Sequence, residues 1–160
     1  MARFDTSGLD DLINDMRRME QDSGPAAEGL VMAAAEIIRQ AWERSAQEHG
    51  LIRTGGLIKS IGYPKKPTDF GSALGIDVYP QGKNKRGTRY AEIAFILHYG
   101  TSRIKPTYWV DDADKYCEET VPVALQKLWD EYLATGKIPS ASAIAAALPA
   151  GGGAKKETIR

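Results

Sequence analysis

The chain has 160 residues, of which 42% are hydrophobic and 26% are charged, a composition typical of one globular domain rather than of a disordered chain. Its 21 Lys and Arg residues balance its 21 Asp and Glu residues, so the formal net charge is zero. Because non-specific nucleic-acid binding depends on neutralising phosphates, this neutrality argues against such binding by the molecule as a whole.

The first helix is predicted from apolar residues that recur at helical spacing between Leu9 and Met19, and Gly24-Pro25 is expected to end it. A second helix is predicted from Leu30 to Ser45. Its inner face is rich in alanine, so another backbone can approach it closely, and Gly50 is a plausible stop.

In the middle of the chain, the helical spacing of apolar residues gives way to turn, strand and loop patterns. Residues 53–61 predict either a short helical turn capped by Thr54 or an irregular arm. Residues 72–79 alternate between two faces, which predicts a half-buried strand, and the polar segment 80–89 predicts a long exposed hairpin loop. Residues 90–99 are apolar enough for a central strand, although the same run could be helical.

A long C-terminal helix is predicted after Trp109, capped by Asp111 or Asp112, kinked or broken just before Pro122, and ended by Gly136. Residues 137–160 are low in complexity and are expected to be a largely disordered tail. The order helix, helix, strands, helix predicts an α+β fold with a small antiparallel sheet, formed by a single domain over residues 1–136.

Several kinds of chemistry lack a sequence signal. Cys117 is the only cysteine, so no disulfide within the chain and no thiolate metal cluster can form, and it is expected to be buried and inert. His49 and His98 belong to no metal motif, and Gly82-Lys83 lacks the rest of a phosphate-binding loop. We therefore expect no metal and no cofactor. The acidic start of the chain does not resemble a signal peptide, and no apolar stretch is long enough to span a bilayer, which predicts synthesis in the cytosol and no membrane partner.

His98, Ser102 and Asp111 (or Asp112) supply the residue types of a nucleophilic triad. Ser102 has no G-x-S-x-G elbow, however, and nothing marks an oxyanion hole. The alternative is a structural corner in which the hydroxyls of Thr101 and Ser102 bond the backbone of a turn. We expect this corner, and no enzymatic activity.

Lys83, Lys85, Arg86 and Arg89 form the densest group of positive charges. Such a run is often only the solvated tip of a loop, but it can also contact an acidic partner surface or DNA phosphates. A nucleic-acid-binding module that uses residues 83–89 is therefore an alternative function. Trp42, Trp109 and Trp129 are expected to anchor the core or an interface.

Three segments carry short motifs in a fixed order along the chain. Residues 8–12 read G-L-D-D-L, residues 53–61 read R-T-G-G-L-I-K-S-I, and residues 98–103 read H-Y-G-T-S-R and are followed by Pro106 and Tyr108-Trp109. This set resembles the gene-product-ten-like family of phage HK ninety-seven, the head–tail joining or tail-completion proteins. The family commonly carries Glu where His98 stands.

The resemblance implies a non-enzymatic virion protein of the neck, assembled in the host bacterial cytoplasm. It implies a homo-oligomeric, hexameric ring between connector or head-completion proteins and tail-tube or tail-terminator proteins, through which genomic DNA passes. A ring needs a heterologous interface. The residues expected at this interface are Arg53, Thr54, Gly55, Lys83, Lys85, Arg86, Arg89, Gly100, Thr101, Ser102, Arg103 and Trp109.

Overall fold

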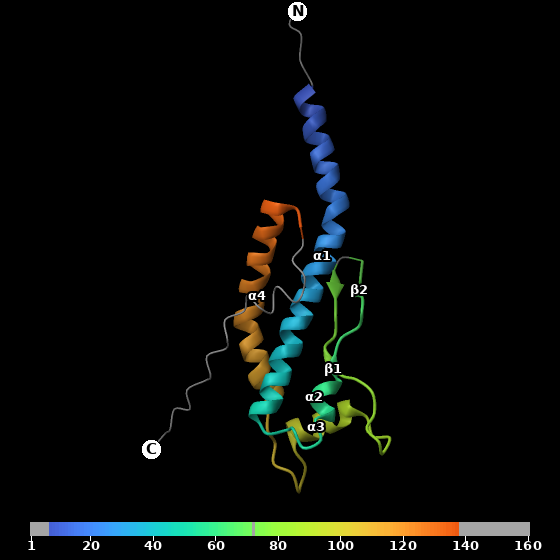
Figure 1. Cartoon of the computed structure of the whole chain (residues 1–160), viewed down its shortest axis with the longest axis vertical. Coiled ribbons are helices and arrows are strands. Elements are labelled where there is room, and N and C mark those ends of the chain that lie inside the picture. The colour runs from blue at the N-terminus through green and yellow to red at the C-terminus, as the bar shows by residue number, and fades with distance from the viewer. Residues whose placement is uncertain (1–6, 72, 138–160) are drawn as a thin grey trace, which may run out of the picture.

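The computed structural model describes residues 7–71 and 73–137, and side chains from residue 24 onward. Two long helices, α1 (Ser7–Glu48) and α4 (Trp109–Thr135), run side by side (Figure 1). The short helices α2 (Gly56–Ser60) and α3 (Tyr90–Tyr99) gather at the end of this pair where α1 stops and α4 begins. The predicted tail lies outside the described residues, apart from Lys137.

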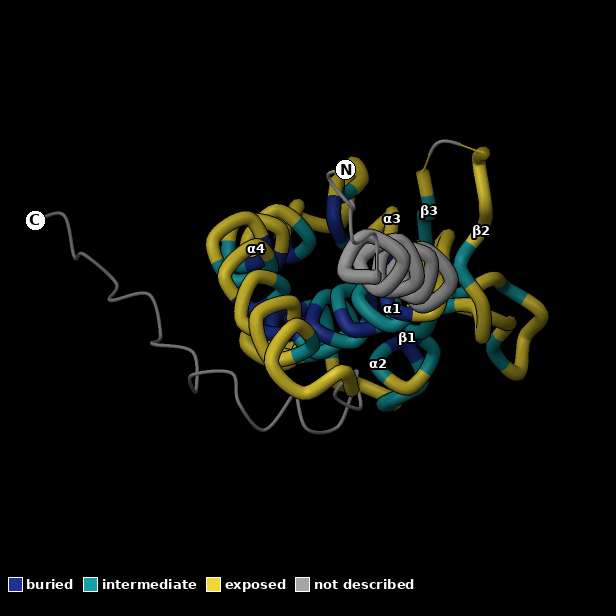
Figure 2. Tube along the Cα trace, turned by 90° about the horizontal axis from the view of Figure 1, so that it is seen from above, coloured by how far each residue is buried: buried dark blue, intermediate teal, exposed yellow. Residues whose placement is uncertain are grey.

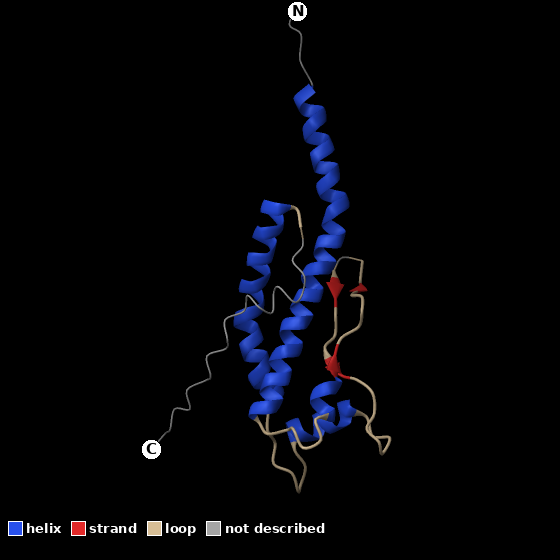
Figure 3. Ribbon diagram, viewed as in Figure 1, coloured by secondary structure: helices blue, strands red, loops and turns tan. Residues whose placement is uncertain are grey.

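The strands form two separate antiparallel pairs (Figure 3). Strand β1 (Ile61–Gly62) pairs with β4 (Tyr79–Pro80), and β2 (Thr68–Asp69) pairs with β3 (Leu74–Gly75). The predicted combination of helices with small antiparallel sheets is thus confirmed. The single strand predicted over 72–79 is instead split into β3 and β4, because Ile76 to Val78 form no ladder.

The N-terminal region is one helix, not the two that were predicted. Helix α1 continues through Gly24-Pro25. The φ angle of proline is compatible with a helix. Because Pro25 has no N–H, the helix loses one hydrogen bond, the one that the Gln21 carbonyl would otherwise accept. Good helix formers lie on both sides, including Met19 and Glu20 before the proline and Ala26 after it, so the local stop signal is overruled.

Residues 90–99 form helix α3, which settles the choice that the sequence left open between strand and helix. Ala94 and His98, four residues apart, are buried on one face, and Ile93 and Leu97 lie half-buried beside them. Residues 81–89 therefore join a strand to a helix and do not form the predicted hairpin between strands of a sheet, although a Lys83–Arg89 bridge closes the loop locally.

The long C-terminal helix is confirmed, with differences at its start and at Pro122. It begins at Trp109 with Tyr108 in the N-cap position, so Asp111 and Asp112 lie in the first turn and are not caps. It continues through Pro122, because the residues beyond the proline pack against α1. The helix ends at Gly136, as predicted. This glycine has a φ of 68°, and its N–H donates to the Tyr132 carbonyl.

The core lies along one face of α1 (Figure 2). Small and apolar side chains of α1 pack against α4 in two layers. In the first, Ala33 and Ile37 pack with Ala124 and Leu128. In the second, Ala41 packs with Ala113 and Cys117. A third layer, around Ala46 and Trp109, covers α2 and α3. Small side chains permit this close approach of two helices, and the buried Ser45 hydroxyl donates to the Trp109 carbonyl over 2.5 Å.

None of the described helices is long and apolar enough to cross a bilayer.

Candidate functional site

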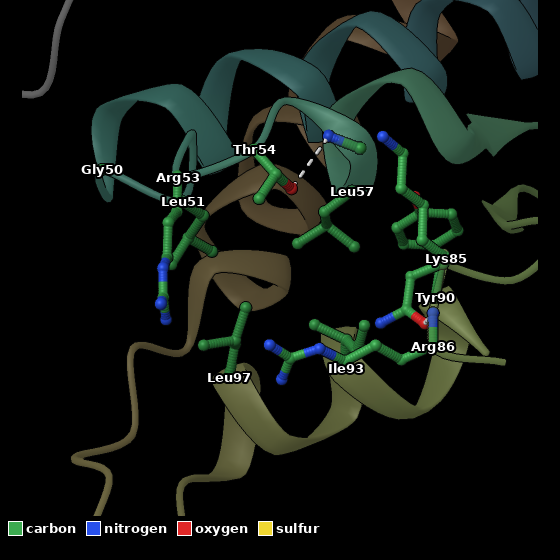
Figure 4. Close-up of a pocket in the computed structure, with 12 residues that line it drawn as sticks. Gly50, Leu51, Arg53, Thr54, Leu57, Lys85, Arg86, Tyr90, Ile93 and Leu97 are labelled. Carbon is green, nitrogen blue, oxygen red and sulfur yellow. Dashed lines mark hydrogen bonds between the residues drawn. The ribbon is translucent and has the colours of Figure 1, made fainter. Parts of the chain in front are cut away.

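A pocket of about 740 Å³ opens where the end of α1, helix α2 and helix α3 meet (Figure 4). Apolar side chains from three different segments line it: Leu51, Leu57, Ile93 and Leu97. Three cationic residues, Arg53, Lys85 and Arg86, line it as well, from both sides in the view of Figure 4. We name this the basic pocket. It brings together two of the segments expected at an interface, residues 53–56 and the 80–89 loop.

The α2 side of the basic pocket is shaped by two glycines. Gly55 occupies the N-cap position of α2 with a φ of 66°, in the left-handed region that favours glycine. The Gly56 N–H donates to the Thr54 hydroxyl over 3.4 Å (Figure 4), but the N-cap of α2 is Gly55 and not Thr54, the residue predicted to cap this turn. A Cβ on Gly56 would lie 2.5 Å from the Tyr90 hydroxyl, so this residue permits the close approach of α2 and α3.

The loop side is held in shape by Asn84. Its side-chain oxygen accepts hydrogen bonds from the Arg86 and Thr88 N–H groups over 2.9 and 3.0 Å. The Asn84 N–H donates to the Thr88 carbonyl, and Gly87 takes a φ of 83° to complete the turn. This network fixes the backbone that carries Lys85 and Arg86, and it is the kind of local side-chain turn that asparagine favours.

The charges of the basic pocket are all of one sign. No Asp or Glu lines it, and within the described part of the chain none of its three cationic residues takes part in an ion pair. Positive charge around an apolar floor suits a ligand that is both anionic and apolar, such as an acidic amphipathic helix.

The Gly100–Arg103 segment directly follows the C-terminal end of α3 and does not line the basic pocket. The Thr101 hydroxyl accepts hydrogen bonds from the Arg103 and Ile104 N–H groups, and the Thr101 N–H donates to the Ile104 carbonyl. Thr101 therefore ties this turn as predicted, whereas among the described residues the Ser102 hydroxyl makes no hydrogen bond to the turn, contrary to its prediction. Ser102 and Arg103 are exposed.

His98 links α3 to α4. Its Nδ1 accepts a hydrogen bond from the Val110 N–H over 3.4 Å, and its Nε2 lies 3.5 Å from Asp111 Oδ1. Among the described residues no hydrogen bond joins His98 to Ser102, the contact on which nucleophile activation depends. Of the three predicted triad residues, His98 and Asp111 thus lie close together, and their contact links α3 to α4.

Trp109 lies in the core of its own chain, which corrects its prediction as an interface residue. Its side chain is 0% exposed and packs edge-on against Trp42, with ring centroids 5.5 Å apart. A fully buried ring has no surface to offer a neighbour. The other predicted residues keep exposed or half-buried positions, and Lys83 and Arg89 lie in the loop beside the basic pocket.

A second polar cluster, which the sequence reasoning missed, surrounds Glu36. Its carboxylate accepts hydrogen bonds from Arg39, Gln40 and Tyr63. The Arg39 guanidinium lowers the pKa of Glu36 from its ordinary 4.5 to about 2, against the opposing effect of burial. Burial, together with the bond to Glu36, raises the pKa of Tyr63 to about 12. The spacing of Glu36, Arg39 and Glu43 is a helix-pair signal, but nothing local announces Tyr63.

Cys117 is buried, as predicted, and burial with the nearby Asp114 carboxylate raises the pKa of its thiol to about 11. The thiolate is the reactive form, and this pKa keeps the thiol protonated at neutral pH. Within the described residues, no group of His, Cys, Asp and Glu is arranged to hold a metal ion.

Comparisons with models of known protein families, with curated protein sequences and with solved structures give no match.

Proposed function

We propose that the chain is a structural protein of a phage or prophage virion that acts at the neck in head–tail joining or tail completion. It forms an oligomeric ring between the connector and the tail tube. The observation that carries the proposal is the order of three family-like segments along the chain, at residues 8–12, 53–61 and 98–103.

Two features of the structure support a role in docking. The second family-like segment, through Arg53 and Thr54, lines a pocket with Lys85 and Arg86. Helix α3 also exposes aromatic side chains, with Phe95 63% exposed and Tyr99 58% exposed. Exposed aromatic and arginine side chains are the groups that most often anchor protein–protein contacts.

Deleting the gene from its phage or prophage tests the proposal directly. We expect DNA-filled heads and finished tails that stay apart in electron micrographs, and their joining should return when the purified wild-type chain is added to the lysate. Normal joined particles from the deletion strain would contradict the proposed function.

The alternative is a nucleic-acid-binding module, favoured by the five cationic residues of the loop and the pocket: Arg53, Lys83, Lys85, Arg86 and Arg89. A binding constant for duplex DNA that falls with salt by about 0.9 log units per phosphate contact per log unit of salt would favour it. A chain that binds DNA in this way and ignores connector and tail-tube proteins would displace the neck proposal.

A further inference from the structure

The first part of α1 projects away from the rest of the molecule. In Figure 1 its ribbon runs past the end of α4, and no other described element lies beside it. Packing between the two long helices begins near Leu30. We name residues 7–23 the N-terminal arm; at about 1.5 Å of rise per residue it is about 25 Å long.

The sequence of the N-terminal arm is acidic and amphipathic. It holds five acidic residues and two arginines, a net charge of 2 − 5 = −3. Its apolar residues recur at helical spacing: Leu9, Leu12, Ile13, Met16 and Met19. An amphipathic helix gains most of its stability by burying its apolar stripe, so the arm is built to pack against a further surface.

The basic pocket has the complementary character. It offers an apolar floor with three cationic residues and no carboxylate, whereas the arm offers an apolar stripe among carboxylates. The apolar floor distinguishes this partner from a nucleic acid, because phosphate contacts require no apolar surface.

The arm cannot reach the pocket of its own chain. The two lie at opposite ends of α1, and residues 24–48 of the same continuous helix separate them by about 37 Å. Contact between them therefore requires two molecules.

We propose that the N-terminal arm of one copy docks in the basic pocket of a second copy. The contact is heterologous, since two different surfaces meet. Repetition of this contact from one molecule to the next closes a ring or extends a filament. The docking rests on the chain's own structure, and only its use as the ring contact of a neck protein rests on the proposed function.

Charge reversal on the full chain tests the docking. The pocket variant carries R53E, K85E and R86E, and the arm variant carries D11K, D15K and D22K. Sedimentation velocity over a range of concentrations, in about 0.05 and about 0.5 M NaCl, measures self-association. We expect the wild type to associate more strongly at low salt, and each variant to associate about tenfold or more weakly.

A matched control reverses three exposed cations that do not line the pocket, Lys59, Lys65 and Lys66, and should associate like the wild type. Far-UV circular dichroism and an unreactive Cys117 thiol show that each variant is folded. Mixing the pocket and arm variants, or combining all six changes in one chain, should restore association, because the reversed charges then match.

Disulfide trapping gives a second, independent readout. Variants M16C and K85C, each made together with Cys117→Ser so that it holds a single cysteine, should cross-link to each other when mixed under oxidising conditions, and K59C should not replace K85C. A wild type that stays monomeric at every concentration overturns the proposal, as does association unaffected by either reversal. Loss of DNA binding in the pocket variant with unchanged association also overturns it. A failed docking together with intact head–tail joining would refute the docking and leave the proposed function standing.

Discussion

Gly100 lies at the corner where α3 turns into the segment that leads to α4. Its φ is 74°, and a Cβ at this position would lie 2.5 Å from the Ile104 carbonyl oxygen and 2.7 Å from the Pro106 nitrogen. Both obstacles are backbone atoms, which cannot rotate away as a side chain can. The glycine is therefore required twice, by its conformation and by the space around it.

Gly100→Ala should lower the free energy of unfolding by on the order of 3 kcal/mol, because a left-handed φ and a backbone clash act together. Urea unfolding followed by tryptophan fluorescence measures the loss. The matched control is Gly82→Ala, where φ is also positive, at 78°, but nothing lies within 4 Å of the added Cβ. It should cost only about 1 kcal/mol. Equal losses at the two sites would show that the close approach at Gly100 is absent.

Glu36 makes stability depend on acid pH. Its pKa is about 2 in the folded chain and 4.5 ordinarily, so the stabilisation is complete above pH 4.5 and is lost as pH falls from 4.5 towards 2. Glu36→Gln should remove on the order of 1–2 kcal/mol at pH 7 and much less near pH 2, where the native carboxyl also becomes neutral. Urea unfolding at several pH values from 7 to about 2.5 measures this. Glu118→Gln, at an exposed position, is the control, and an equal loss at every pH would contradict the argument.

At the scale of elements, Pro122 inside α4 shows how packing outweighs a local rule. An interior proline costs a helix about 3 kcal/mol. Beyond Pro122, Ala124 and Leu128 bury against α1, and full burial of a leucine side chain alone contributes about 1.5–3 kcal/mol. The helix therefore continues.

Pro25→Ala should stabilise the chain by about 2 kcal/mol, because alanine restores the N–H that the Gln21 carbonyl lacks within one continuous helix. Thermal unfolding followed by circular dichroism measures the gain. If Gly24-Pro25 separated two helices instead, the substitution would leave the helical signal and the melting temperature unchanged.

At the scale of the whole molecule, the core and the N-terminal arm are separate parts of one long helix. The layered contacts of α1 with α4, α2 and α3 hold the domain together, whereas the arm extends beyond α4.

Removing residues 1–23 should therefore shift the melting temperature by no more than about 2–4 °C, the effect of about 1 kcal/mol in a domain of this size. The same truncation should abolish self-association in sedimentation experiments. A large fall in melting temperature would show that the arm contributes to the core of its own chain, contrary to this division.

The sequence by itself determined the features that depend on neighbours along the chain. The long α4, its end at Gly136 and the turn held by Thr101 follow from local spacing and from single residues. Only the tertiary structure decided that α1 is unbroken, that residues 90–99 are helical and that Trp109 is buried. Periodicity cannot choose between strand and helix in so short a run, and here the burial of Ala94 and His98 on one face made the choice. The basic pocket likewise needed the fold, because Arg53 and Arg86, 33 positions apart in the sequence, line one pocket only where α2 packs against α3.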